Sequence, residues 1–176
     1  RVAVLGTVGN GIWPQLEPSS MTTLGALGLQ RRLHNYALQS VNGIAMEVSS
    51  HALEQHRVEA VDFDVALFTG LSRDHLDYHY TMNAYGEAKA RLFQSPHLRY
   101  AVVNVDDSFT ERLMQLGSLK CQWFGVSLRP DACASIPLTF PRSIKQQPHG
   151  FMVDLSTPWG ESSFFLPLLG TFNVMN

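Results

Sequence analysis

The stretch VALFTGLSRDHLDYH occupies residues 65–79 and joins a short apolar run to a dense group of acid and imidazole side chains. The run Val65–Phe68 is typical of a strand, because it is short and apolar. Ligands bind beyond the carboxyl ends of strands in an open parallel sheet, so the residues after Phe68 are well placed to form a site. Their Asp and His side chains favour a divalent cation or general acid–base chemistry. A short helix capped by Ser72, with exposed Asp and His, remains the alternative.

Short apolar runs alternate with helical patterns on both sides of this stretch, as in a parallel sheet with helical crossovers. The first helix is expected at Met21–Ala37, with Ser19 or Ser20 as its N-cap. Its apolar face is expected to be formed by Leu24, Leu27, Leu29 and Leu33. The other elements predicted here are strands at Val2–Leu5, Gly43–Val48 and Tyr100–Val105 and helices at Met82–Phe93 and Ser108–Leu116.

After about Lys120 the pattern changes to short strand-like runs separated by turns that contain proline and glycine. We expect these runs to form a small antiparallel sheet attached to the α/β layer. They are Gln122–Val126, Ala132–Ile136, Phe151–Leu155 and Ser162–Leu166. The predicted fold class is therefore α/β, a mostly parallel sheet with flanking helices plus a small antiparallel sheet.

The chain has 176 residues, 45% of them hydrophobic and 16% charged, with a net charge of −2. This composition excludes a disordered chain and a coiled coil, and it leaves no basic footprint for nucleic acid or a membrane surface. No apolar run approaches the ~20 residues of a transmembrane helix. Cys121 and Cys133 give neither a disulfide framework nor a zinc knuckle. We expect a single domain of a cytoplasmic protein that binds no nucleic acid and does not insert into a membrane.

Two further side chains lie at positions where chemistry is expected. Glu47 closes the apolar run 43–46, where a carboxylate either binds a metal, acts in catalysis or caps a neighbouring helix. Lys89 falls on the same helical stripe as Met82, Tyr85 and Leu92. An ammonium group that points inward needs a partner or a chemical change, because burying it bare is costly. Snorkelling, with a packed stem and the charged head in water, is the alternative.

The glycine-rich segment Gly6–Gly11 follows a predicted strand but fails as a phosphate-binding loop. Ile12 and Trp13 stand where a Walker A loop needs Lys and Ser or Thr. We interpret the segment as a turn that could face a ligand.

Taken together, several motifs resemble the central domain of the Mur ligases, a P-loop NTPase-like fold, and in particular its diaminopimelate-adding branch. The longest are MEVSSHAL at residues 46–53, QHR at 55–57, FTGLSRDHLDYH at 68–79 and YGEAK at 85–89. Shorter matches follow in the same order along the chain: Gly6–Gly11, Thr22-Thr23, NVDD at 104–107 and GTFNVMN at 170–176.

The resemblance implies an ATP-dependent amide ligase of peptidoglycan precursor synthesis in the bacterial cytoplasm. Such an enzyme phosphorylates the terminal carboxylate of UDP-MurNAc-L-Ala-D-Glu, and the amine of meso-diaminopimelate then displaces phosphate. Matching positions imply catalytic roles for Lys89 and His75, and a Mg²⁺ site made by Glu47, His75 and Lys89, the last as a carbamate. They imply adenine contacts at Asn173 and Asn176. They also imply substrate contacts at Thr22, Thr23, Ser49, Gln55 and Arg57.

The chain also departs from the family. Met21, Gly70 and Tyr80 replace the usual Asn, Asn and Gly. The family's P-loop lies upstream of the segment that matches Arg1, and its uridine-binding and carboxyl-terminal domains have no counterpart in residues 1–176. Because an apolar run begins at Val2 and the chain stops where a helix is about to start, we expect a central domain truncated at both ends and inactive alone.

Other functions are compatible with parts of this pattern. Within the ligases, lysine-adding and folate-polyglutamate-synthetase-like enzymes remain open. A metal-dependent hydrolase could be built on Asp74, His75, Asp77 and His79. A nucleotide-sugar binding module without turnover is the alternative that is not an enzyme.

Overall fold

The computed structural model describes residues 1–133, 135–170 and 172–175. The chain divides into two compact units. Unit 1 consists of Arg1–Asp62 and His79–Arg91, and unit 2 consists of Phe63–Tyr78 and Leu92–Asn176. No helix among the described residues is long and apolar enough to cross a membrane.

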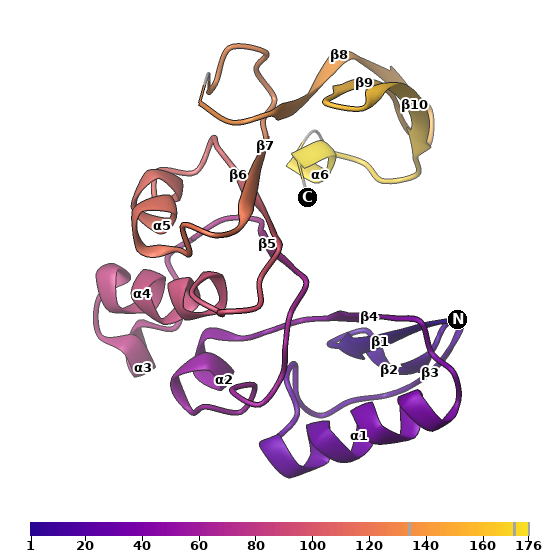
Figure 1. The fold of residues 1–176 in the computed structure, drawn as a ribbon. Coiled ribbons are helices and arrows are strands. Elements are labelled where there is room, and N and C mark those ends of the chain that lie inside the picture. Colours follow the sequence, from indigo (N-terminus) through magenta and orange to yellow (C-terminus); the bar gives the residue numbers. More distant parts are fainter. Residues whose placement is uncertain (134, 171, 176) are drawn as a thin grey trace. The chain divides into compact units, whose positions relative to one another are not determined.

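Unit 1 contains a four-stranded sheet in the order β3-β2-β1-β4 (Figure 1). Strand β1 pairs antiparallel with β2 and parallel with β4, so the sheet is mixed. Its strands are β1 (Val2–Gly6), β2 (Gly9–Ile12), β3 (Gln15–Glu17) and β4 (Gly43–Met46), and its helices include α1 (Ala26–Leu38) and α2 (Ser50–Glu54). Most of α4 (Met82–Phe93) also belongs to this unit.

Helix α1 begins five residues later than the sequence pattern suggested, at Ala26 and not at Met21. The predicted N-cap was wrong because the Ser19 hydroxyl forms a local turn instead, bonding both the amide and the carbonyl of Met21. Gly25 caps the helix without a side-chain hydrogen bond. The buried face contains Leu29 and Tyr36, whereas Leu27 is 87% exposed and was assigned to the wrong face.

The glycine-rich segment after β1 is a hairpin and not only a turn. Thr7 and Val8 form the turn, and Gly9 to Ile12 form strand β2. Glycine is needed at position 11 because a Cβ there would lie 2.2 Å from the carbonyl oxygen of Gln15 on β3.

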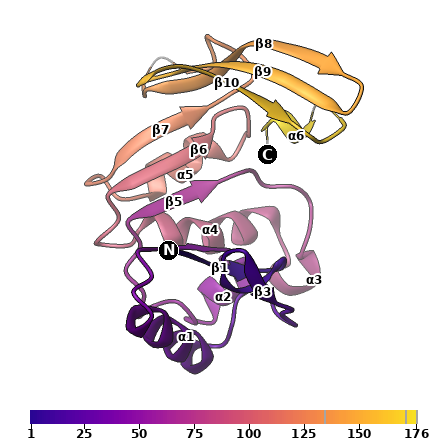
Figure 2. The ribbon, with the colours of Figure 1, turned by 90° about the vertical axis from the view of Figure 1, so that its right-hand side faces the viewer.

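Unit 2 contains a six-stranded sheet in the order β10-β9-β8-β7-β6-β5 (Figure 2). Strands β5 to β8 are parallel and β8 to β10 are antiparallel, which confirms the predicted α/β class. The strands are β5 (Val65–Phe68), β6 (Tyr100–Asn104), β7 (Gln122–Val126), β8 (Leu138–Gln147), β9 (Gly150–Thr157) and β10 (Gly160–Leu166). The short helices are α3 (Leu76–His79), which ends at the boundary of unit 1, α5 (Thr110–Leu116) and α6 (Phe172–Met175).

The strand predicted at Ala132–Ile136 was wrong. The described residues of that segment form bends, and the strand that completes the antiparallel part is β8, which begins at Leu138. Strand β8 escapes a hydrophobic pattern search because its second half is exposed and polar and because it has an irregular register between Pro141 and Ser143.

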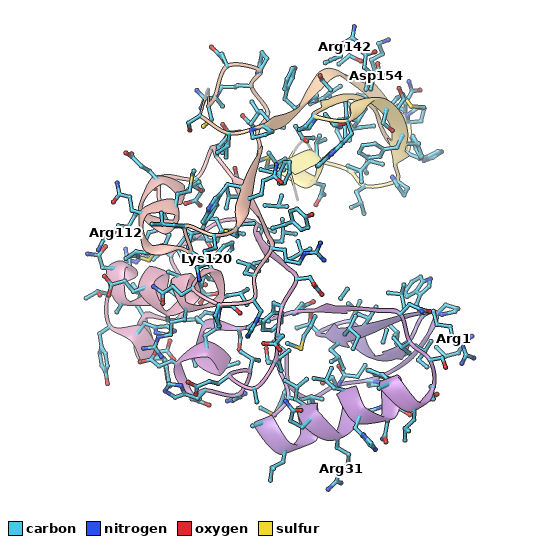
Figure 3. The ribbon with its side chains drawn as sticks, viewed as in Figure 1. Arg1, Arg31, Arg112, Lys120, Arg142 and Asp154 are labelled. Carbon is cyan, nitrogen blue, oxygen red and sulfur yellow. The ribbon has the colours of Figure 1, made fainter. Side chains whose placement is uncertain are left out.

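Polar side chains link the antiparallel strands on their exposed surface. Asp154 on β9 accepts hydrogen bonds from Ser143 on β8 and Ser163 on β10, and these bonds lower the pKa of the Asp154 carboxyl. Arg142 on β8 forms an ion pair with Glu161 on β10. Figure 3 shows Arg142 and Asp154 at the same end of this sheet. Such cross-strand contacts stabilise the register of the strands.

Strand β5 is the outermost strand at the other end of the six-stranded sheet. Ala66 and Phe68 are buried, whereas Val65 is 53% and Leu67 is 61% exposed. Its outer edge and one of its faces therefore present apolar groups.

Asp106 joins the two segments that follow β6 and β7. Its carboxylate accepts hydrogen bonds from the Ser127 hydroxyl (2.9 Å), the Leu128 amide (2.8 Å) and the Arg129 guanidinium (3.0 Å). Burial alone would raise the pKa of Asp106, but the bonds from Leu128, Ser127 and Arg129 outweigh it and lower the pKa below its usual value.

We predict that Leu29→Ala lowers the free energy of unfolding by about 2–5 kcal/mol, because it leaves a cavity under α1. Leu27→Ala on the same helix is the matched control and is expected to change it by less than about 0.5 kcal/mol. Urea unfolding followed by circular dichroism measures both. Equal effects of the two substitutions would contradict the burial described here.

We predict that Asp106→Asn destabilises the protein at pH 7 by about 1–3 kcal/mol, because it removes a hydrogen-bonded charge. The pKa of Asp106 in the folded protein lies below the value of about 3.9 in the unfolded chain. The stabilisation by this carboxylate is therefore complete above about pH 3.9 and is lost as the pH falls through the pKa of the folded state. The difference from the unsubstituted protein should therefore shrink below about pH 4. Thermal unfolding of both proteins between pH 7 and pH 3 measures this difference, with the exposed Asp131→Asn as control. A difference in stability that stayed constant over this pH range would refute the role of the Asp106 carboxylate.

Candidate functional site

The residues between β4 and α2 are held together by the side chain of Thr23. Its hydroxyl donates to the carbonyl oxygen of Glu47 (2.9 Å) and accepts from the amide of Ser49 (2.9 Å). Ser49 is the N-cap of α2 and accepts a hydrogen bond from the amide of Ala52 (3.2 Å). Thr23 is only 2% exposed, and its engaged hydroxyl holds Glu47 and Ser49 in place.

Arg57 lies on the other side of Thr23, after the end of α2. Its guanidinium donates to the Thr23 carbonyl oxygen (3.1 Å) and to the side-chain oxygen of Gln55 (2.9 Å). The structure therefore brings together Thr23, Ser49, Gln55 and Arg57, four of the five predicted substrate contacts. The fifth, Thr22, is adjacent in sequence and half-buried. A partly exposed guanidinium in this setting suits a carboxylate or phosphate group.

Glu47 follows β4 at its carboxyl end and is exposed. Its carboxylate accepts from the amide (3.2 Å) and the hydroxyl (2.9 Å) of Thr7, in the turn after β1. A Cβ at position 6 would lie 2.7 Å from Cδ of Glu47, so a larger residue than glycine there would displace this carboxylate. The carboxylate oxygens keep further lone pairs and are the hard ligands that Mg²⁺ prefers, so Glu47 fits a metal-binding role.

Lys89 lies on α4, half-buried, on the stripe that the sequence indicated. Its Nζ lies 5.2 Å from the ring centroid of Tyr85. Burial lowers the pKa of the Lys89 amine, and no carboxylate among the described residues forms an ion pair with it. A lowered pKa favours the neutral amine, the form that reacts with carbon dioxide.

His75 follows β5 in a loop that two side chains from the end of β6 hold in place. Asn104 donates to the carbonyl oxygen of Thr69 (2.8 Å), and Asp107 accepts from the amide of Leu71 (2.7 Å). The His75 backbone has a positive φ of 55°, and the side chain lies 3.6 Å from the carboxylate of Asp74. The sequence motif contained Asn104 and Asp107, but no role was assigned to them; their contacts show that they position this loop.

Backbone geometry accounts for one of the three departures from the family pattern. Gly70 has φ +153°, and a Cβ there would lie 3.1 Å from the Asp107 carboxylate. Glycine is therefore the least strained residue at this position. Tyr80 has φ +63° and is exposed, so the glycine usual in the family fits this backbone with less strain. Nothing in the structure explains Met21.

A pocket of about 370 Å³ lies within unit 2, beyond the carboxyl ends of β5, β6 and β7. This is large enough for a small ligand. Asn173 on α6 lines it and donates to the carbonyl oxygen of Leu169 (2.7 Å). The other lining residues are Leu67, Phe68, Thr69, Asn104, Val126, Phe164, Leu166, Val174 and Met175. Asn176, the second predicted adenine contact, lies outside the described residues.

The structure does not gather the residues of the alternative hydrolase site. Among the described residues, no three His, Cys, Asp or Glu side chains lie close enough to hold a metal ion. His79 is buried against Ser50 and Glu54 of α2. Of the predicted Mg²⁺ ligands, Glu47 and Lys89 belong to unit 1 and His75 belongs to unit 2.

Three comparisons connect this geometry with known proteins. The family model of the Mur ligase middle domain matches residues 1–176. A curated relative from Coxiella burnetii, named UDP-N-acetylmuramoyl-L-alanyl-D-glutamate–2,6-diaminopimelate ligase, is 43% identical over the whole of this chain and 36% of its own length. The chain thus spans about a third of the length of that relative.

Solved structures are also similar to this chain. The structure of a UDP-N-acetylmuramoyl-L-alanyl-D-glutamate–2,6-diaminopimelate ligase matches 99% of this chain and 35% of its own, with a TM-score of 0.87 and 40% identity. An FPGS from L. casei matches 99% of this chain and 48% of its own with a TM-score of 0.60, but at 12% identity it shares the fold alone.

Proposed function

Because the chain belongs to the Mur ligase middle-domain family, we propose that it works in an ATP-dependent acid–amino-acid ligase of peptidoglycan precursor synthesis in the bacterial cytoplasm. The reaction joins meso-diaminopimelate to UDP-MurNAc-L-Ala-D-Glu. The observation that supports the proposal most is the 43% identity to a ligase of that name, together with the hydrogen bonds that connect Thr23, Ser49, Gln55 and Arg57. The resemblance assigns the P-loop and the two flanking domains to parts of such a ligase other than residues 1–176.

The substrate is held, in this proposal, by the groups around Thr23. The guanidinium of Arg57 binds an anionic group of the nucleotide sugar peptide through two parallel N–H donors. Ser49 offers its hydroxyl at the N-terminus of α2, and Gln55 keeps Arg57 in place. Positioning of this kind lowers the barrier because the carboxylate is already oriented for attack on the γ-phosphate.

The chemical step transfers the γ-phosphoryl group of ATP to the terminal carboxylate, giving an acyl phosphate and ADP. The amine of the incoming amino acid then attacks the acyl carbon, and phosphate leaves as the amide forms. Glu47, His75 and Lys89 as a carbamate would hold Mg²⁺, which neutralises the charge on the transferring phosphoryl group. Asn173 and Asn176 would contact adenine, and the pocket beside Asn173 supports the first assignment.

The alternatives draw less support. The similarity to folate-type ligases lies in the fold alone, at 12% identity. The choice of diaminopimelate over lysine rests on the names of the similar ligases. The family match and the names of the similar ligases favour an enzyme over a binding module without turnover.

We predict that Arg57→Ala raises the KM for UDP-MurNAc-L-Ala-D-Glu about 10-fold to 100-fold in the complete gene product, because it removes charge-assisted hydrogen bonds. Ser49→Ala should act in the same direction and additionally weaken α2 by about 1 kcal/mol through loss of its N-cap. Steady-state kinetics with each substrate varied measures both. The exposed Arg31→Ala on α1, visible in Figure 3, is the control. A rise confined to the KM for ATP would refute the assignment.

We predict that Lys89→Ala reduces ligation at least about 1,000-fold without unfolding the protein, because it removes the carbamate from a phosphoryl-transfer site. A short carboxylic acid added to this variant should restore part of the rate by replacing the carbamate. Lys120→Ala, at an exposed lysine, is the control. Wild-type turnover of Lys89→Ala, measured by release of phosphate, would refute the role of Lys89.

A further inference from the structure

The imidazole of His79 is almost completely buried, with 1% of the side chain exposed, and it contacts both ends of α2. Its Nε2 lies 2.9 Å from the hydroxyl of Ser50, the first residue of the helix. Its Nδ1 lies 3.0 Å from the carboxylate of Glu54, the last residue of the helix. Nδ1–H donates to the Glu54 carboxylate, and Nε2 shares a hydrogen bond with the Ser50 hydroxyl.

Serine, histidine and carboxylate in this order have the connectivity of a hydrolytic triad. Ser50, however, is only 2% exposed, so a substrate has no access to its hydroxyl. The three groups form a closed polar network that satisfies a buried imidazole. The imidazole of His79 also contacts an aromatic ring outside this network.

A further contact of His79, with Tyr85, leads to Lys89. The ring of Tyr85 stacks on the imidazole with centroids 5.3 Å apart and an interplanar angle of 24°. Nζ of Lys89, one helical turn further along α4, lies 5.2 Å from the centroid of the same Tyr85 ring. The orientation of the Tyr85 ring thus depends on His79, and the surroundings of the Lys89 amine depend on Tyr85.

Helix α2 lies next to the groups proposed to bind substrate. Ser49 caps its first turn, and Gln55 follows its last residue. His79 therefore connects α2, beside the proposed substrate site, with α4, which carries Lys89. A second contact, from the Arg91 guanidinium to the carbonyl oxygen of Leu53 (3.5 Å), joins the same two helices at a longer distance.

We propose that His79 is a positioning residue for ligation. Held by Ser50 and Glu54, it fixes the Tyr85 ring and thereby keeps the Lys89 amine at a set place relative to α2. This inference rests on the proposed function, in which Lys89 takes part in phosphoryl transfer.

The test uses the complete gene product with His79→Phe, which keeps an aromatic ring but loses both hydrogen bonds. We expect kcat to fall about 10-fold or more while the KM for ATP changes less than about 3-fold, because misplacement of a reacting group affects the chemical step. Glu54→Ala should reproduce the effect, and Glu54→Gln should retain most of the activity, since its amide oxygen can still accept from Nδ1–H. His34→Phe, at an exposed histidine of α1, is the control.

A second readout does not depend on activity. Trace acetylation with acetic anhydride, quantified by mass spectrometry, compares the reactivity of Lys89 with that of Lys120 in the same molecule. We expect His79→Phe and Glu54→Ala to change this ratio at least about 3-fold and His34→Phe to leave it unchanged. If His79→Phe fails to fold, Glu54→Ala decides, because Glu54 is partly exposed.

The two readouts separate this inference from the proposed function. An unchanged acetylation ratio together with unchanged kcat in both variants overturns the positioning role while the ligase stands. A changed ratio in a protein that does not ligate supports the link from His79 to Lys89 and overturns the proposed function alone.

Discussion

The hydroxyl group of Thr23 is the contact on which the arrangement of unit 1 most depends. It joins the carbonyl oxygen of Glu47 to the amide of Ser49, and so fixes the direction in which the chain leaves β4 and enters α2. The carbonyl of the same residue accepts from Arg57. A buried hydroxyl that both donates and accepts a hydrogen bond stabilises the fold by only about 1 kcal/mol per bond. Loss of this hydroxyl, however, would leave two backbone groups without a partner. The backbone of the exposed Glu47 and the Arg57 guanidinium are thus both bonded to this single residue, one through its hydroxyl and the other through its carbonyl.

In unit 2, too, side chains order the loops by bonding backbone atoms that are distant in sequence. The residues beyond the carboxyl ends of β5, β6 and β7 are connected by carboxylate and amide side chains that bond backbone atoms of neighbouring segments: Asn104 to Thr69, Asp107 to Leu71, and Asp106 to Leu128. Each of these bonds spans more than twenty residues of sequence, so the loops are ordered by the sheet and not by their own propensities. A loop anchored in this way can present a histidine at a positive φ angle, as it does at His75.

Sequence reasoning succeeded where the signal is local. The apolar run Val65–Phe68 and the helical stripe on Met82–Phe93 match β5 and α4, and the stripe identified Lys89 as half-buried. It failed at the start of α1, where a local turn at Ser19 replaces the expected N-cap, and along β8, where the pattern is polar. Motif resemblance named Thr23 as a substrate contact. That its hydroxyl bonds Glu47 and Ser49 could not be predicted, because those partners are 24 and 26 residues away. The same holds for His79, whose bond to Ser50 spans 29 residues.

The position of β5 at the end of its sheet has a consequence for handling the protein. An edge strand presents a row of backbone donors and acceptors, and here apolar side chains at Val65 and Leu67 accompany them. Edges of this kind are templates on which a strand of another molecule can pair, and β5 carries neither a charged residue nor a proline that would discourage it. The sheet of unit 2 thus carries at β5 the features of a self-association edge, and a lysine at position 65 or 67 is the substitution that would weaken it.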